Sequence, residues 1–121
     1  MASEIFESKE EGLVRARISG VMVLADQMAL EAVAKRLIDT GQKTSLLVAL
    51  DNFEGWEKNE AWGDDLQFQL EYGDRIARIA IVGNERWKDQ ALLFVGKGFR
   101  DTEIEFFPTG SSDIAEAWLR R

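Results

Sequence analysis

The chain has 121 residues, of which 45% are hydrophobic and 31% charged, and this length and balance predict one globular domain over residues 1–121. It contains no cysteine and no histidine, which excludes disulfides, thiol or imidazole catalysis, and thiolate or imidazole metal ligands. The formal net charge is −7, and no window collects a run of Lys and Arg, so we expect no binding to nucleic acid.

The first part of the chain predicts a hairpin followed by a helix. Residues 3–7 and 12–18 read as two short antiparallel strands on either side of an acidic turn. Residues 24–40 place apolar side chains at spacings of three and four, and Gly41 follows as a helix C-terminal signal.

The chain is organised around residues 46–51, an apolar run that stops at Asp51. Such a run is typical of a parallel strand buried on both faces. We expect the strand to end at Asp51 and residues 51–56 to form a loop. The carboxyl end of such a strand is where an open α/β sheet usually keeps its binding crevice.

The remaining elements alternate between helix and strand. The patterns predict helices over 60–72, 85–96 and 111–119, and strands over 76–82 and 103–107. The order ββαβαβαβα predicts an α/β fold with a single mixed, mostly parallel sheet of four to five strands and about four helices.

These residues also carry a resemblance to a known family. The chain resembles the SpoIIAA-like family, small bacterial domains of STAS/CRAL-TRIO type, in its order of elements and in four stretches: residues 46–56, residues 79–83 with Trp87, Phe106-Phe107, and residues 115–119. The resemblance implies a four- or five-stranded sheet with helices packed on it, no assigned enzymatic activity, and kinship with lipid-carrying domains.

More distant relatives, the anti-sigma-factor antagonists, carry a phosphorylatable serine or threonine just beyond the equivalent buried strand. Here residues 51–56 contain no hydroxyl side chain. The resemblance therefore does not extend to a phosphorylation switch.

Two kinds of polar feature were weighed as sites. Asp51 with Asp64 and Asp65 could supply carboxylates for acid–base work or for Mg²⁺, but a loop acid and two acids early in a helix explain them more simply. Gly83-Asn84 and residues 96–98 match no phosphate-binding fingerprint and are favoured as turns. We expect no enzyme, no catalytic residue, no metal and no cofactor.

The apolar faces of two predicted helices are more informative. Helix 60–72 has two apolar ridges, of which one would cover the sheet and the other would meet a neighbouring helix, another subunit, a ligand or a membrane surface. Helix 85–96 has a wide apolar face. The tryptophan of the last helix, Trp118, is expected to lie elsewhere.

These faces predict a non-enzymatic domain that binds a small apolar or amphipathic, lipid-like ligand between its second and third helices. The candidate ligand-binding residues are Phe53, Trp56, Trp62, Leu66, Phe68, Trp87, Leu92, Val95 and Phe99. The alternative is a regulatory protein-interaction module of STAS type without the phosphorylation switch, using the same surface for a protein partner or a homodimer. No stretch reaches about 18 apolar residues and the start is acidic, so we expect a cytoplasmic protein with at most peripheral membrane contact.

Overall fold

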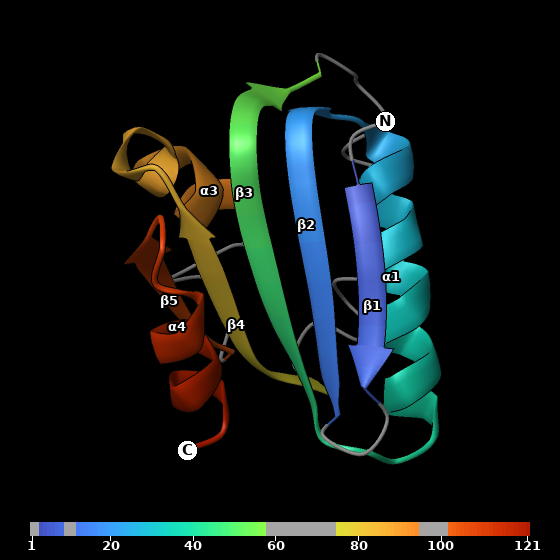
Figure 1. Ribbon diagram of the computed structural model, residues 1–121. Coiled ribbons are helices and arrows are strands. Elements are labelled where there is room, and N and C mark those ends of the chain that lie inside the picture. Colours follow the sequence, from blue (N-terminus) through green and yellow to red (C-terminus); the bar gives the residue numbers. More distant parts are fainter. Residues whose placement is uncertain (1–2, 9–11, 58–74, 95–101) are drawn as a thin grey trace.

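One five-stranded sheet organises the molecule. The computed structural model describes residues 3–8, 12–57, 75–94 and 102–121. The strands lie in the order β1-β2-β3-β4-β5, with β1 antiparallel to β2 and all other neighbours parallel (Figure 1). Their bounds are β1 Ser3–Ser8, β2 Leu13–Met22, β3 Thr44–Trp56, β4 Ile76–Gly83 and β5 Glu103–Pro108. The predicted mixed, mostly parallel sheet with an antiparallel edge is confirmed.

Helices cover both faces of this sheet. α1 spans Leu24–Asp39, the 3₁₀ turn η3 spans Glu85–Trp87, α3 spans Lys88–Phe94 and α4 spans Ser112–Leu119. Figure 1 shows α1 and α3 behind the sheet and α4 in front of it. The predicted second helix, residues 60–72, lies outside the described residues, as does the end of the third beyond residue 94.

The larger core lies between the sheet and the helices α1 and α3. Alternate residues of β2 point into it, as the period of two in a strand requires, and one stripe of α1 packs on them. The buried members from these two elements are Val14, Ala16, Ile18, Met22, Leu30, Ala34, Leu37 and Ile38. Full burial of each Val, Leu, Ile or Met side chain in this layer contributes about 1.5–3 kcal/mol to stability.

A smaller core lies on the opposite face under α4. It joins Leu13, Leu47, Ala80, Val82, Ala115 and Leu119. Trp118 belongs to this side, with its ring 5.8 Å from that of Phe107 and the Arg78 guanidinium 5.1 Å above it. Trp118 therefore packs with α4, away from Trp56 and Trp87, which belong to the larger core on the other face of the sheet.

The central strand is longer than predicted. β3 continues past Asp51 to Trp56, because it keeps pairing with β2 as far as the partners Met22 and Trp56. The expectation of a loop over residues 51–56 was wrong: Asn52 and Gly55, which read as loop residues, are accommodated inside the strand at irregularities of register.

The described helices include none that is both long enough and apolar enough to span a bilayer.

Candidate functional site

The candidate site is a crevice at the carboxyl ends of three parallel strands. A cavity of about 320 Å³ opens where β3 approaches its end and where the chain leaves β4 and β5. Its walls come from Leu50, Asp51, Asn52, Phe53, Asn84, Arg86, Trp87 and Thr109. This is the edge at which α/β sheets generally bind ligands, and the sequence predicted it from the position of Asp51.

Two irregularities in β3 shape one wall of the crevice. Between the paired positions Ile18–Leu50 and Gly20–Phe53, β3 holds one residue more than β2, and a second extra residue precedes Trp56. The backbone adopts positive φ at Asn52 (51°) and Gly55 (112°), as β-bulges often require. In a regular strand, Leu50 and Phe53 would point to opposite faces of the sheet. Because each bulge inserts one extra residue, Leu50, Phe53 and Trp56 all point to the α1/α3 face.

Phe53, Trp56 and Trp87 form one aromatic cluster. The ring centroids of Phe53 lie 4.8 Å from Trp56 and 5.1 Å from Trp87, and the two tryptophans are 6.0 Å apart, all in edge-to-face geometry. Such pairs contribute about 0.5–1.5 kcal/mol each beyond their buried area. The cluster therefore fixes η3 against the end of β3.

Gly55 allows the backbone conformation beside this cluster. Its φ of 112° is one that side chains rarely adopt, and a Cβ there would lie 3.4 Å from Cη2 of Trp87, at van der Waals contact. A glycine is therefore needed here for the backbone conformation.

Trp87 connects the cluster to the crevice. It is half-buried, it packs on the larger core, and it also lines the cavity. The Arg86 guanidinium lies 4.9 Å from its ring centroid, a cation–π arrangement that holds the charge over the mouth of the crevice. The Asn84 side chain accepts a hydrogen bond from the Arg86 amide at 2.9 Å and so caps η3.

The charged groups of the crevice have different environments. Asp51 is engaged by Arg17, whose Nε donates to Oδ2 at 3.0 Å, and this hydrogen bond raises the pKa of Arg17 above its usual value. Among the described residues no carboxylate forms an ion pair with Arg86. The crevice therefore presents one compensated anion and one cation that remains available to a ligand.

The structure brings together part of the predicted set of ligand-binding residues. Phe53, Trp56 and Trp87 are in mutual contact, and Leu92 of α3 packs half-buried against the same core. The other five candidates, Trp62, Leu66, Phe68, Val95 and Phe99, lie outside the described residues.

Sequence reasoning missed the polar lining. Asn84 and Thr109 each follow the end of a parallel strand, and strands that run parallel end at the same edge of a sheet. That rule could have placed both residues beside Asp51. Gly83-Asn84 was favoured as a plain turn, and the structure adds that Asn84 also lines the crevice.

A carboxylate site formed by Asp51, Asp64 and Asp65 gains no support from the described part of the chain. Asp51 is paired with Arg17, while Asp64 and Asp65 lie outside it. Within that part no three acidic side chains gather closely enough to hold a metal ion.

The fold and this edge crevice define a small α/β domain with a mixed, mostly parallel sheet. A family model described as SpoIIAA-like matches residues 13–120, and the chain belongs to the SpoIIAA-like family. The resemblance seen in the sequence is thereby confirmed.

A solved structure shares the fold. It is that of an uncharacterized protein from the DUF3478 family with a SpoIIAA-like fold, from Shewanella loihica PV-4. The two are 22% identical with a TM-score of 0.70, over 98% of this chain and 92% of that one. At this identity the likeness concerns the fold alone. Among curated proteins, none matches the chain significantly.

Proposed function

We propose that this protein is a non-enzymatic domain that binds a small amphipathic molecule, lipid-like in having an apolar body and a polar head, in the crevice beside Trp87. One observation carries the proposal: an aromatic wall and several polar side chains meet at the carboxyl edge of the parallel strands. A volume of about 320 Å³ is at the small end of the range for ligand pockets, about 300–1,000 Å³.

The apolar part of the ligand would lie on Trp87 and the exposed margin of Leu50 and Phe53. Phe53 is only 7% exposed, so it supports the wall from beneath, whereas Trp87 keeps part of its ring in solvent. Covering that ring removes apolar surface from water at about 25 cal/mol per Å².

The polar part would be anionic. Arg86 offers a guanidinium held over the aromatic wall, and Asn52, Asn84 and Thr109 line the same space with amide and hydroxyl groups. A carboxylate, sulfonate or phosphate head suits this set because guanidinium donors bind oxyanions with strong, charge-assisted hydrogen bonds. Asp51, on the opposite wall and paired with Arg17, would keep the head on the Arg86 side.

The first test is binding of an apolar anionic dye, anilinonaphthalene sulfonate, to the native protein. Thr109→Phe should fill the exposed mouth of the crevice and weaken dye binding at least about tenfold, the factor that corresponds to 1.4 kcal/mol. Ser112→Phe adds the same ring three residues later without lining the crevice, and should leave binding unchanged. Equal dye binding by both variants would contradict the proposed location.

A second pair of variants tests the polar head. Arg86→Gln removes the cation of the crevice. It should weaken dye binding by about tenfold, since a hydrogen bond to a charged group is worth about 1.5–3 kcal/mol. The control is Lys88→Gln, which changes the net charge of the protein by the same amount as Arg86→Gln. Lys88 is exposed and does not line the crevice. If the two variants lose affinity equally, the effect is one of overall charge and the assigned role of Arg86 is wrong.

A regulatory protein-interaction module is the second candidate. An arginine stacked on a partly exposed tryptophan is a pair that interface hot spots favour. Under this alternative the native protein binds no dye, and the Arg86→Gln variant loses a protein partner that the Lys88→Gln variant retains.

A further inference from the structure

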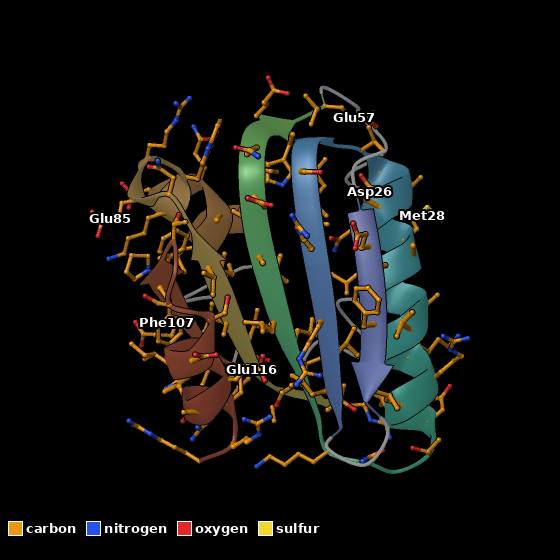
Figure 2. The ribbon with its side chains drawn as sticks, viewed as in Figure 1. Asp26, Met28, Glu57, Glu85, Phe107 and Glu116 are labelled. Atoms are coloured by element: carbon orange, nitrogen blue, oxygen red, sulfur yellow. The ribbon has the colours of Figure 1, made fainter. Side chains whose placement is uncertain are left out.

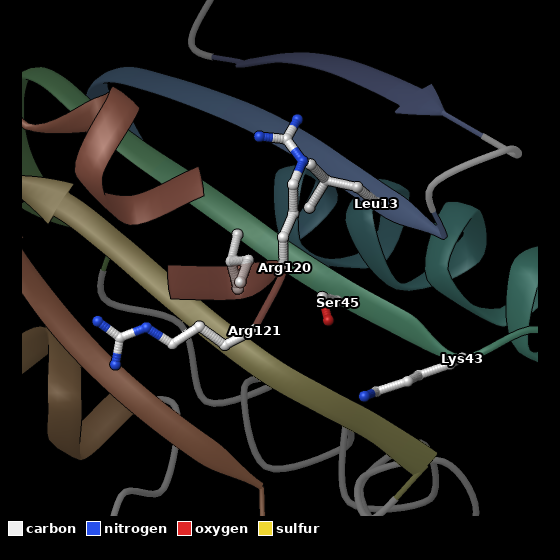
Figure 3. Close-up of a pocket in the computed structure, with 6 residues that line it drawn as sticks. Leu13, Lys43, Ser45, Arg120 and Arg121 are labelled. Carbon is white, nitrogen blue, oxygen red and sulfur yellow. The ribbon is translucent and has the colours of Figure 1, made fainter. Parts of the chain in front are cut away.

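A second pocket lies at the opposite edge of the sheet. A cavity of about 260 Å³ opens between the beginnings of β2 and β3 and the end of α4 (Figure 3). It is lined by Leu13, Lys43, Ser45, Leu119, Arg120 and Arg121. Since the first crevice lies at the carboxyl ends of the strands, the two cavities are separated by the length of the sheet.

The lining of this pocket is basic, although the molecule as a whole is acidic. The chain as a whole carries −7, yet the pocket has three cationic side chains and no acid in its lining. Neither Lys43 nor Arg121 forms an ion pair with any carboxylate in the described part of the chain. A positive site on an acidic surface selects anions by local contact, because long-range attraction from the rest of the protein is absent.

Arg120 of the lining pairs with the carboxylate of Glu116 on α4. Glu116 lies 3.2 Å from Nη2 of Arg120, and its same Oε1 atom is 2.8 Å from Nη2 of Arg15 on β2. The case for a basic pocket therefore rests on Lys43 and Arg121.

Compensation of the helix dipole explains only part of this charge. The negative end of the α4 dipole is equivalent to about half an elementary charge, which offsets fewer charges than the three cations supply. Lys43, moreover, comes from the connection before β3 and not from the helix.

The floor of the pocket combines an apolar base with a hydroxyl. Leu13 and Leu119 are buried at 3% and 8% exposure, and Ser45 on β3 pairs with Leu13 on β2. The Ser45 amide donates to the Gly12 carbonyl at 2.8 Å, which fixes its backbone. In Figure 3 the Ser45 side chain and the Lys43 ammonium both face the space beside the end of α4.

We infer that this basic pocket binds the phosphate group of a small molecule. Lysine and arginine donors together match a doubly charged anion with several acceptor oxygens, and the Ser45 hydroxyl adds one further hydrogen bond. Three cations are too few for a nucleic-acid backbone on a chain of this charge. The phosphate belongs either to a soluble phosphate ester or to the head group of a lipid, and its chemistry at the pocket is the same.

The test uses glycerol phosphate followed by amide chemical shifts of the full chain. Saturable shifts at Ser45 and Arg121, absent with glycerol, are expected. The double variant Lys43→Ala/Arg121→Ala should weaken binding at least about tenfold, whereas Lys35→Ala/Arg36→Ala, which removes two exposed cations of α1, should not. Equal affinity of the two double variants, or no saturable shift at Ser45, overturns the inference for a soluble ester.

A second arm distinguishes the source of the phosphate. Vesicles of phosphatidylcholine with and without phosphatidic acid are sedimented with the protein. Retention that needs phosphatidic acid and is lost in Lys43→Ala/Arg121→Ala assigns the pocket to a lipid head group, while glycerol phosphate binding alone assigns it to a soluble ester. Failure in both arms overturns the proposal. Because neither arm uses the dye or the Arg86→Gln variant, the result is independent of the function proposed for the other crevice.

Discussion

Glu116 joins two elements that are 101 positions apart in sequence. Glu116 is labelled in Figure 2. Its carboxylate accepts from Arg15 Nη2 at 2.8 Å and from Arg15 Nε at 3.3 Å, and it also accepts from Arg120 Nη2. The hydrogen bonds from Arg15 hold the pKa of Glu116 below the ordinary value of 4.5. The pair fastens α4 to β2 beside the smaller core.

This depressed pKa predicts how stability changes with pH. A carboxyl whose pKa is lowered by folding stabilises the protein above its unfolded pKa and loses that contribution as the pH falls through the folded pKa. Glu116→Gln should therefore lower the free energy of unfolding by about 1 kcal/mol near neutral pH, a value reduced for partial exposure. The difference from the wild type should vanish as the pH drops well below 4.5.

Urea denaturation across that pH range measures the effect. Glu105→Gln provides the control, since Glu105 is exposed on β5 and forms no ion pair among the described residues. A loss from Glu116→Gln that stayed constant down to low pH would show that the side chain acts through packing and not through its charge.

At the scale of the element, the bulges of β3 determine where the aromatic cluster forms. Asn52 has a φ of 51°, a conformation that asparagine and glycine tolerate and that β-branched residues avoid. Asn52→Val should lower the free energy of unfolding by about 1–2 kcal/mol, whereas Asn52→Gly should stay within about 1 kcal/mol of the wild type.

The near-ultraviolet circular dichroism of the tryptophans reports on the same element. Asn52→Val should reduce the signal of the packed Trp56 and Trp87 rings, because straightening the bulge turns Phe53 away from them. If Asn52→Val were as stable as Asn52→Gly and kept the wild-type spectrum, the bulge would not be what positions the cluster.

The existence and type of the described elements could be predicted from the sequence. The buried stripe of α1 and the apolar runs of β3 and β4 follow from periodicity alone, because the residues that repeat are those that face the core. The extension of β3 to Trp56 could not, since Asn52 and Gly55 have the local chemistry of a loop and only pairing with β2 makes them part of a strand.

The lining of the carboxyl-edge crevice could also be predicted only in part, because some of its residues come together only through the pairing of the strands. The aromatic residues were recognisable by type, and Asp51 by its place after a buried run. Arg86 has no signal of its own, because it joins the crevice only through the order of the strands in space. The partnership of Glu116 with Arg15 likewise depends on α4 crossing the sheet.

At the scale of the whole molecule, the sheet separates two environments. Its carboxyl edge holds an aromatic crevice with one available cation, and its amino edge holds a basic pocket under the end of α4. The proposed amphipathic ligand and the proposed phosphate group would therefore occupy different sites, and each site can be altered by substitution without changing the other.

The central claim is that the carboxyl-edge crevice holds a small amphipathic molecule, and native mass spectrometry of freshly purified protein tests it most directly. The wild type and Ser112→Phe are expected to carry a non-covalent adduct of small-molecule mass, and Thr109→Phe, which fills the crevice, is expected to lack it. The claim is contradicted if the wild type shows the bare mass of the chain, or if Thr109→Phe retains the same adduct.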